Sequence, residues 1–322
     1  YDRWPEVLQQ AADWGLLGGH EVQGYVRLQP TLAYFLRAGT TASDEQKEAR
    51  NEAFRLHYEQ VGIALERLMQ SRKAEEKQRS QALAHLEYEN LYCAMEMGLT
   101  RKTDFYYQFS ALFEFLLARQ DGSRRLALCR TVASFRETYD SQQLQGEIGA
   151  DFYKALARLG VTLLDMKRYS ESERTHLDIV DLLSGLESLA PELRGQWTAI
   201  NYHQLGMVAQ EQRQWAQAEQ YYRQALDLFI EFNDRYSQAG TYHQLGMVAQ
   251  EQRQWAQALQ YLLKDLEIST EFKDDYGVGI TLRSLARLHR ESGDASVLAA
   301  TAQVLGVSAA EVAALFAGAL EE

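Results

Sequence analysis

Histidine is the residue type in this chain best suited to metal binding, and three histidines lie between residues 202 and 290, at His203, His243 and His289. Their spacing of 40 and 46 residues places each of them on a different helix of the surrounding pattern. Metal ligands must converge to about 2 Å from one ion, whereas packed helices lie about a helix diameter, roughly 10 Å, apart. We therefore expect no metal at these histidines.

Other side chains with catalytic potential lack the partners that catalysis needs. Cys93 and Cys129 have no CxxC or histidine-linked spacing and lie in apolar helical stretches, which favours small buried thiols. Acidic runs such as Asp44-Glu45 and Glu75-Glu76 are typical of solvated faces and helix starts. No nucleophile stands beside a base, and no GxxxxGKS or GxxxxGKT loop is present to cradle a triphosphate. The chain is predicted to be no enzyme and to need no cofactor.

The amino-acid composition indicates that helices position these residues. Only three prolines occur in 322 residues, so the main helix breaker is rare and strong helix formers dominate.

A formal net charge of −12 argues against a nucleic-acid partner, because phosphate binding draws on clustered Lys and Arg. No window approaches the roughly 18–20 apolar residues of a membrane span, and the first residues show no signal pattern. We expect a cytoplasmic protein with no membrane partner.

The strongest internal signal is a repeat, because the segment from Tyr202 to Ala218 recurs without change at 242–258, 40 residues later. Within the first copy, residues spaced i, i+3, i+4 and i+7 form one stripe of a helix: Tyr202, Leu205, Gly206 and Ala209. A glycine inside a helix costs about 1 kcal/mol relative to alanine, so Gly206 indicates a second helix that crosses closely there. The second helix carries its own stripe of Ala218, Tyr222 and Ala225. Such a hairpin must stack on others to bury its apolar face.

This pattern of aromatic, leucine, glycine and small residues, followed by alanine, aromatic and alanine, resembles the tetratricopeptide repeat. The resemblance covers 199–233 and 239–273, with Asp265 where the second copy would have its last alanine. It implies an all-α fold, a tetratricopeptide-type α-solenoid in which the hairpins wind into a right-handed superhelix. The array is expected over 151–294, with a period of 40 residues instead of the usual 34 or so. Residues 295–322 are expected to form C-terminal capping helices.

The first helices of stacked hairpins line a concave groove, and the family register places a polar, methionine-containing wall there. Its residues are Arg158; His203, Gln204, Met207, Gln210 and Glu211; His243, Gln244, Met247, Gln250 and Glu251; and Arg283, Arg287 and Arg290. Amides satisfy an extended backbone and methionine adapts to varied side chains, so the predicted ligand is a protein or peptide. The alternative is that these residues are solvated helix faces copied by duplication.

The first half, over 41–150, is predicted to be a divergent helical-repeat region. Its breaks are expected near 71–73, 99–103, 120–123 and 140–142. A thick apolar face in this region is expected to pack as core, because aromatic stripes at helical spacing usually face a neighbouring helix. It comprises Phe105, Phe109, Phe113, Phe115 and Leu116.

Residues 1–40 have a different pattern, which indicates a winged-helix remnant. A helix from Pro5 to Leu17 leads into a Gly18-Gly19 turn, a strand over 24–29 and a second helix from Pro30. A chain of about 40 residues rarely supports a core of its own. We therefore expect this remnant to dock on the helices that follow.

Three features together resemble the C-terminal region of a STAND-class NTPase, a group of NLR-like signal-transducing ATPases. They are ADWGLL at 12–17 with YVRLQP at 25–30 and Leu36-Arg37, HLEYENLYCA at 85–94, and the repeat array. The resemblance implies an NTPase domain upstream in a parent chain, with the solenoid as its sensor domain. Gln29 stands where such winged helices offer a histidine to the nucleotide, which argues against direct nucleotide sensing by this segment.

Three functions are consistent with these patterns. The first is a ligand-sensing, autoregulatory arm of a STAND NTPase in bacterial defence or signalling, in which partner binding relieves autoinhibition. The second is a free-standing scaffold that tethers protein partners. The third is a winged-helix transcription regulator, which is disfavoured because 30–38 contains no basic recognition helix.

Overall fold

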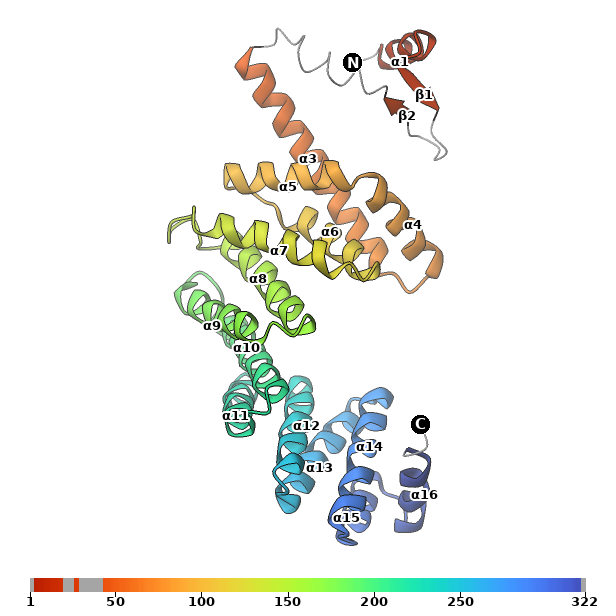
Figure 1. Cartoon of the computed structure of the whole chain (residues 1–322), viewed down its shortest axis with the longest axis vertical. Helices are drawn as coiled ribbons and strands as arrows, with labels where there is room; N and C mark the ends of the chain where they lie inside the picture. Colours follow the sequence, from red (N-terminus) through yellow and green to blue (C-terminus); the bar gives the residue numbers. More distant parts are fainter. Residues whose placement is uncertain (1–2, 20–25, 29–42, 320–322) are drawn as a thin grey trace. The chain divides into compact units, whose positions relative to one another are not determined.

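The computed structural model describes residues 3–19, 26–28 and 43–319, which are helical apart from one pair of short strands. The chain divides into two compact units, Tyr1–Leu56 and His57–Glu322. The elements (Figure 1) are α1 (Trp4–Asp13), β1 (Leu17–Gly19), β2 (Val26–Leu28), α3 (Asp44–Met69), α4 (Ala74–Leu86), α5 (Tyr88–Arg101), α6 (Tyr106–Ala118), α7 (Gly122–Arg136), α8 (Glu147–Asp165), α9 (Tyr169–Gly185), α10 (Pro191–Glu211), α11 (Trp215–Glu231), α12 (Arg235–Glu251), α13 (Trp255–Glu271), α14 (Asp275–Ser292), α15 (Ser296–Leu305) and α16 (Ala309–Ala319).

The N-terminal unit contains α1, the two strands and the start of α3. The strands pair antiparallel, with Gly18 opposite Arg27, so the expected Gly18-Gly19 turn is wrong and these glycines lie in a strand. Helix α1 ends at Asp13, four residues before the predicted end. The chain leaves the helix through Gly15, whose φ of +69° suits a residue without a side chain. Gln29, the helix expected from Pro30 and Leu36-Arg37 lie outside the described residues, so the winged helix stays a prediction.

In the C-terminal unit, helices α4 to α16 each contact the next helix along the chain. The pairs α8 and α9, α10 and α11, and α12 and α13 are hairpins, and their first helices also contact one another across repeats. Helix α14 continues this series of first helices after α12. The predicted all-α stack of helical hairpins is therefore confirmed.

Close packing within the hairpins explains the glycine of the repeat. A Cβ atom added at Gly206 would lie 2.5 Å from ring atoms of Tyr222, and one at Gly246 would lie 2.8 Å from Leu262. Ala218, Tyr222 and Ala225 are all fully buried. The prediction that a second helix crosses closely at Gly206 is correct.

The turn inside each hairpin has the same backbone geometry. Helix α10 ends at Glu211, and Arg213 then adopts a left-handed φ of +57°. The backbone N–H of Gln214 donates to the carbonyl oxygen of Ala209 at 2.9 Å, which satisfies one of the last carbonyls of the helix. Arg253 repeats this conformation in the next hairpin, with a φ of +58°.

The apolar face predicted as core in the first half is buried, with side chains between 0% and 6% exposed at Phe105, Phe109, Phe113, Phe115 and Leu116.

The two cysteines differ in their exposure to solvent. Cys129 is buried, and burial raises the pKa of its thiol to about 12. Cys93 is exposed, which corrects the expectation of two buried thiols. It lies on α5 outside the buried stripe of Leu91, Ala94, Met95, Gly98 and Leu99, because burial on this helix follows the i, i+3, i+4 spacing.

Helices α15 and α16 end the described chain and pack against α13 and α14. Val312 and Phe316 of α16 are buried in one apolar cluster with Leu285 and Leu288 of α14. Among the described residues, no single helix combines the length and apolar composition of a membrane span, whereas α15 and α16, bent by 101°, pass that test only as a pair.

Candidate partner-binding site

All the residues predicted to line a groove lie on first helices of the hairpins, namely α8, α10, α12 and α14. These helices follow one another in contact, α8 with α10, α10 with α12, and α12 with α14. The structure therefore brings the predicted residues onto one series of neighbouring helices. It also places several of them inside the fold, in contact with other parts of the chain.

Arg158 on α8 is held by the helix that precedes it in the stack. Its guanidinium is 3.0 Å from a carboxylate oxygen of Glu114 and lies over the ring of Phe113 at 4.6 Å. Both partners belong to α6. The side chain is only 23% exposed, so its contacts join two helices of the chain.

His203 on α10 lies between repeats. Its Nδ1 is 3.1 Å from the hydroxyl oxygen of Thr241 on α12, and its ring packs against Tyr222 with centroids 5.2 Å apart. Burial lowers the pKa of His203 to about 4, because an apolar environment disfavours the charged imidazolium. The neutral ring therefore serves as an interhelical contact at neutral pH.

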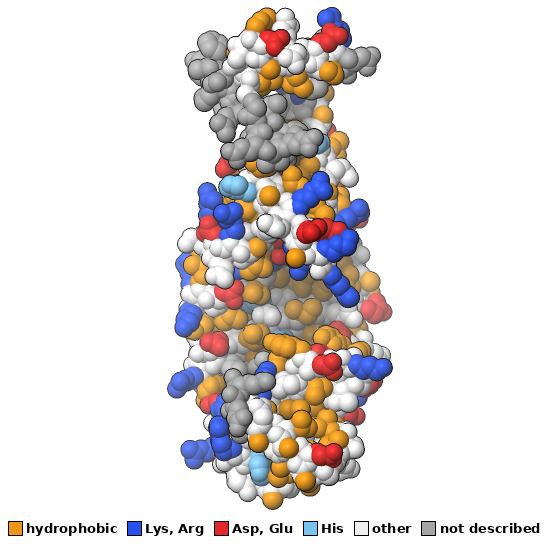
Figure 2. All heavy atoms as spheres, turned by 90° about the vertical axis from the view of Figure 1, so that its right-hand side faces the viewer, with side chains coloured by type: hydrophobic (Ala, Val, Ile, Leu, Met, Phe, Trp, Pro, Cys, Tyr) orange, Lys and Arg blue, Asp and Glu red, His pale blue; other side chains and the backbone are white. Residues whose placement is uncertain are grey.

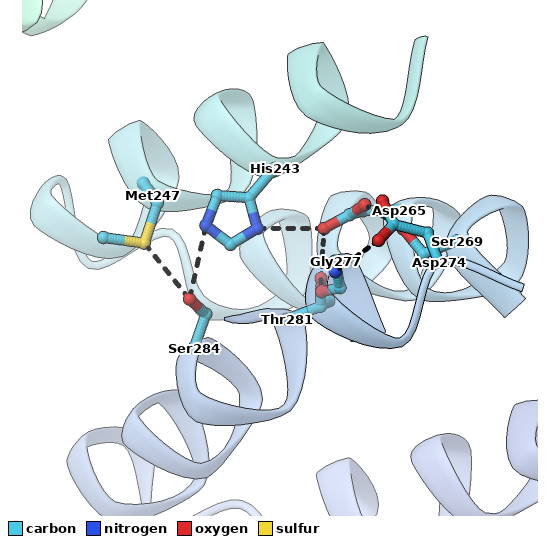
Figure 3. A network of polar contacts seen from close by, with 8 residues as sticks. All are labelled: His243, Met247, Asp265, Ser269, Asp274, Gly277, Thr281 and Ser284. Atoms are coloured by element: carbon cyan, nitrogen blue, oxygen red, sulfur yellow. Dashed lines mark hydrogen bonds and ion pairs between the residues drawn. The ribbon is translucent and has the colours of Figure 1, made fainter. Parts of the chain in front are cut away.

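His243 occupies the same position one repeat later and has a different partner. Its Nδ1 lies 2.9 Å from Oδ2 of Asp265 on α13, and Figure 3 shows the ring between this carboxylate and Ser284 of α14. The distance from Nε2 to the hydroxyl oxygen of Ser284 is 3.4 Å. Three helices therefore meet at this imidazole.

Asp265 is the centre of this polar network, although it is only 4% exposed. The hydroxyl of Ser269 donates to Oδ1 at 3.1 Å, and the hydroxyl of Thr281 on α14 donates to Oδ2. Burial of a carboxylate is costly unless hydrogen bonds replace its water. Donors from α12, α13 and α14 do so here.

The amide and methionine side chains of the predicted wall differ in their burial and in their hydrogen bonds to the rest of the chain. The Ser284 hydroxyl donates to the sulfur of Met247 at 3.6 Å, and the Tyr222 hydroxyl donates to the amide oxygen of Gln210 at 2.9 Å. Gln250 is 2% exposed and donates to the carbonyl oxygen of Ser284. Gln250 thus lies inside the fold instead of on the wall, because α14 packs over it. Gln204, Gln244 and Met207 are half-buried.

Four of the six charged residues of the wall are exposed. They are Glu211, Glu251, Arg283 and Arg290. Arg287 on α14 lies 2.7 Å from a carboxylate oxygen of Glu251 on α12, which links two repeats by an ion pair.

A pocket of about 420 Å³ opens beside the Asp265 network, between α12, α13 and the start of α14. His203, His243 and Gln244 line it together with residues that the sequence prediction missed, including Tyr236, Asp265, Asp274 and Tyr276. The signal for the pocket was present in the repeat, since Asp265 and Ser269 replace Ala225 and Phe229 at the 40-residue offset. Nothing in the period alone showed that these two changes leave an open space.

The described part of the chain contains no group of three or more His, Cys, Asp or Glu side chains placed to hold a metal ion. His203 and His243 instead contact Thr241 and Asp265.

Comparisons with known families agree with this architecture. Two tetratricopeptide-repeat family models match the chain, one at residues 198–231 and one at 237–297. These segments are tetratricopeptide repeats. They cover most of α10, all of α11, and then most of α12 with α13, α14 and the residues that follow, so most of the candidate site lies within them, with Arg158 and Tyr236 outside. No curated protein sequence matches the chain.

Solved structures with similar folds share little sequence with this chain. The apo form of RapI is 14% identical, with 78% of this chain and 80% of that chain covered and a TM-score of 0.54. BtubC from P. vanneervenii is 17% identical, with 79% and 93% covered and a TM-score of 0.50. At such identities the likeness shows the fold alone.

A STAND protein with a tetratricopeptide repeat sensor from Pyrococcus horikoshii is 12% identical, with 99% of this chain and 47% of that chain covered. Its TM-score is 0.47, which is too low to support an argument. The predicted STAND relationship therefore stays a prediction.

Proposed function

We propose that the chain binds an extended segment of a partner protein along α10, α12 and α14. The observation that carries the proposal is the contact of α10 with α12 and of α12 with α14, which makes one surface from the side chains of three repeats. Tetratricopeptide repeats bind proteins or peptides in general, and an extended segment suits such a surface because it contacts several repeats at once.

The charges on this surface favour a partner segment of mixed charge. Acidic Glu211 and Glu251 are exposed on α10 and α12, and basic Arg283 and Arg290 are exposed on α14. Figure 2 shows acidic and basic side chains interspersed on one face of the molecule, with hydrophobic side chains between them. Complementary charges on a partner set its orientation and speed its association.

Binding is tested by comparing two triple variants of the full chain as bait in a bacterial lysate. The groove variant carries Gln204→Ala, Glu211→Ala and Gln244→Ala, all on first helices. The control variant carries Gln220→Ala, Asp227→Ala and Gln260→Ala, which are exposed positions on the second helices α11 and α13. We expect the groove variant to lose captured proteins that the control retains. Capture of the same proteins in the same amounts by both variants would exclude the first-helix surface.

The wider role that we propose is that of a ligand-sensing arm of a STAND-class NTPase in the bacterial cytoplasm, in defence or signalling. The sequence features at 12–30, 36–37 and 85–94 and the repeat array support it. Partner binding would relieve autoinhibition and permit oligomerisation of the parent protein. The test is ATP turnover by the full parent protein with and without a captured partner. A parent sequence without an NTPase domain would make the chain a free-standing scaffold instead.

A further inference from the structure

The pocket beside Asp265 lies in the second of two repeats whose segments 202–218 and 242–258 are identical. In the first copy, Ala225 and Phe229 fill the corresponding space and are 0% and 2% exposed. In the second copy, Asp265 and Ser269 take their places. Loss of the phenyl ring leaves room, and the new carboxylate makes that room acidic.

A third difference widens the opening. Gly240 lies on the pocket wall, where the first copy has Ile200. A Cβ atom added at Gly240 would meet no other atom within 4 Å. Glycine here is therefore not required by close helix packing, and it leaves space that a larger side chain would occupy.

The electrostatic character of the pocket favours a cation. Asp265 and Asp274 both line it, and none of the described lining residues is Lys or Arg. The hydrogen bonds to the Asp265 carboxylate come from two hydroxyls and an imidazole nitrogen. Asp274 accepts a hydrogen bond from the hydroxyl of Tyr236 at 3.3 Å.

Two exposed tyrosines stand at the mouth of this pocket. Tyr236 is 56% exposed and Tyr276 is 77% exposed, and both line the pocket. The faces of aromatic rings attract cations, with Arg the more frequent partner. The hydrogen bonds around Asp265 explain how α12, α13 and α14 are joined, but they do not require open space or exposed aromatic rings beside the carboxylate.

We infer that this pocket accepts the cationic head of an Arg or Lys side chain from the bound partner protein. The inference rests on the proposed function, and it adds the chemistry of one subsite. An arginine head presents several N–H donors in a plane, which suits carboxylate oxygens below and aromatic rings at the rim. The partner segment would then be fixed in register by one basic residue.

The first experiment selects peptides from a random library on the full chain and on three variants. Asp265→Ala with Ser269→Phe installs the residues of the first copy, and Tyr276→Ala removes an exposed ring without changing the core. Asp227→Asn is the control, since it removes one exposed charge on α11, away from the pocket. We expect peptides selected on the native chain and the control to share one Arg or Lys position, and both pocket variants to lose that preference.

The second experiment measures a single cation without any peptide. Binding of N-acetyl-arginine methylamide to the full chain is followed by NMR, with the uncharged citrulline analogue as the matched probe. We expect the arginine probe to bind at least about tenfold more tightly than the citrulline probe, a difference of about 1.4 kcal/mol. We also expect added salt to weaken its binding.

The outcomes separate this inference from the proposed function. Selected peptides without a shared basic position, or equal binding of the two small probes, would overturn the cation pocket while protein binding stood. Failure to select any peptide would count against the proposed function, and the small probes would still test the pocket. Circular dichroism of each variant shows that a lost preference does not come from unfolding, and Tyr276→Ala is the variant least able to disturb the core.

Discussion

The imidazole Nδ1 of His243 lies 2.9 Å from the carboxylate Oδ2 of Asp265, although the identical histidine one repeat earlier contacts a threonine hydroxyl instead. The histidines belong to identical segments. What differs is the residue on the following helix, aspartate in one repeat and alanine in the other. A change at one position of α13 therefore alters the environment of an unchanged residue on α12.

Removal of the Asp265 carboxylate should destabilise the array. Asp265→Ala leaves the donors of His243, Ser269 and Thr281 without their acceptor, and we expect a loss of about 1–3 kcal/mol. The double variant Asp265→Ala with Ser269→Phe should lose less, because it restores the side chains that pack in the first copy. Urea unfolding of the full chain measures both. Equal stability of Asp265→Ala and the native chain would show that the network contributes nothing to folding.

Two glycine substitutions should distinguish the effect of close packing on stability from the effect of helix propensity. Gly206→Ala puts a methyl group against the ring of Tyr222, and we expect it to destabilise the chain by about 1–3 kcal/mol. Gly279→Ala on α14 meets nothing within 4 Å and should stabilise by up to about 1 kcal/mol through helix propensity. Thermal unfolding monitored by circular dichroism distinguishes the two. Similar shifts in both variants would contradict the close crossing at Gly206.

Stability should fall in mild acid because of His203. Its pKa in the folded chain is lowered to about 4, whereas an unfolded histidine titrates near 6.5. The unfolded state therefore binds more protons between these values, and stability decreases as the pH falls through that window. We expect His203 to account for a loss of about 1 kcal/mol between pH 7 and pH 5.5.

Urea midpoints at several pH values measure this loss. His176 is also buried, with a lowered pKa, so the His203→Gln variant should keep part of the pH dependence of the native chain. An unchanged pH dependence in that variant would mean that His203 is not protonated on unfolding as expected.

Arg158 should matter for stability and not for partner capture. Arg158→Ala removes its ion pair with Glu114 and its contact with Phe113, and we expect a loss of about 1–2 kcal/mol. Arg290→Ala is the matched change at an exposed position of α14 and should leave stability within about 0.5 kcal/mol. If the Arg158→Ala variant were fully folded and still captured less partner than the native chain, this arginine would instead belong to the binding surface.

The two cysteines should react at different rates with a thiol-reactive dye. Cys93 is exposed, whereas Cys129 is buried with a thiol pKa raised to about 12, and the thiolate is the reactive form. We expect one equivalent of dye per native chain and a second only after unfolding in urea. Cys93→Ser should abolish the fast reaction. Fast labelling of that variant would show that Cys129 is accessible in the native state.

Much of the fold was predictable because helical signals are local. Leu205, Gly206 and Ala209 follow Tyr202 by three, four and seven residues, a spacing that depends only on about two turns of one helix, and the structure buries all three. The exact 40-residue repeat likewise required hairpins that pack on their neighbours. The N-terminal strand was predicted only in part, because Gly18 and Gly19 pair with a segment several residues away instead of turning.

The candidate site was predicted as a set of helix positions and not as an arrangement of atoms. Composition and period alone determined that the chain is a helical repeat array and placed His243 and Gln244 on a first helix. Only the tertiary structure decided that Gln250 is covered and that Arg158 is bound by α6. It also decided that Asp265 meets His243 and Thr281, which are 22 and 16 residues away. The physical reason is that such meetings depend on how neighbouring helices cross, and that crossing is set by packing between residues far apart in the chain.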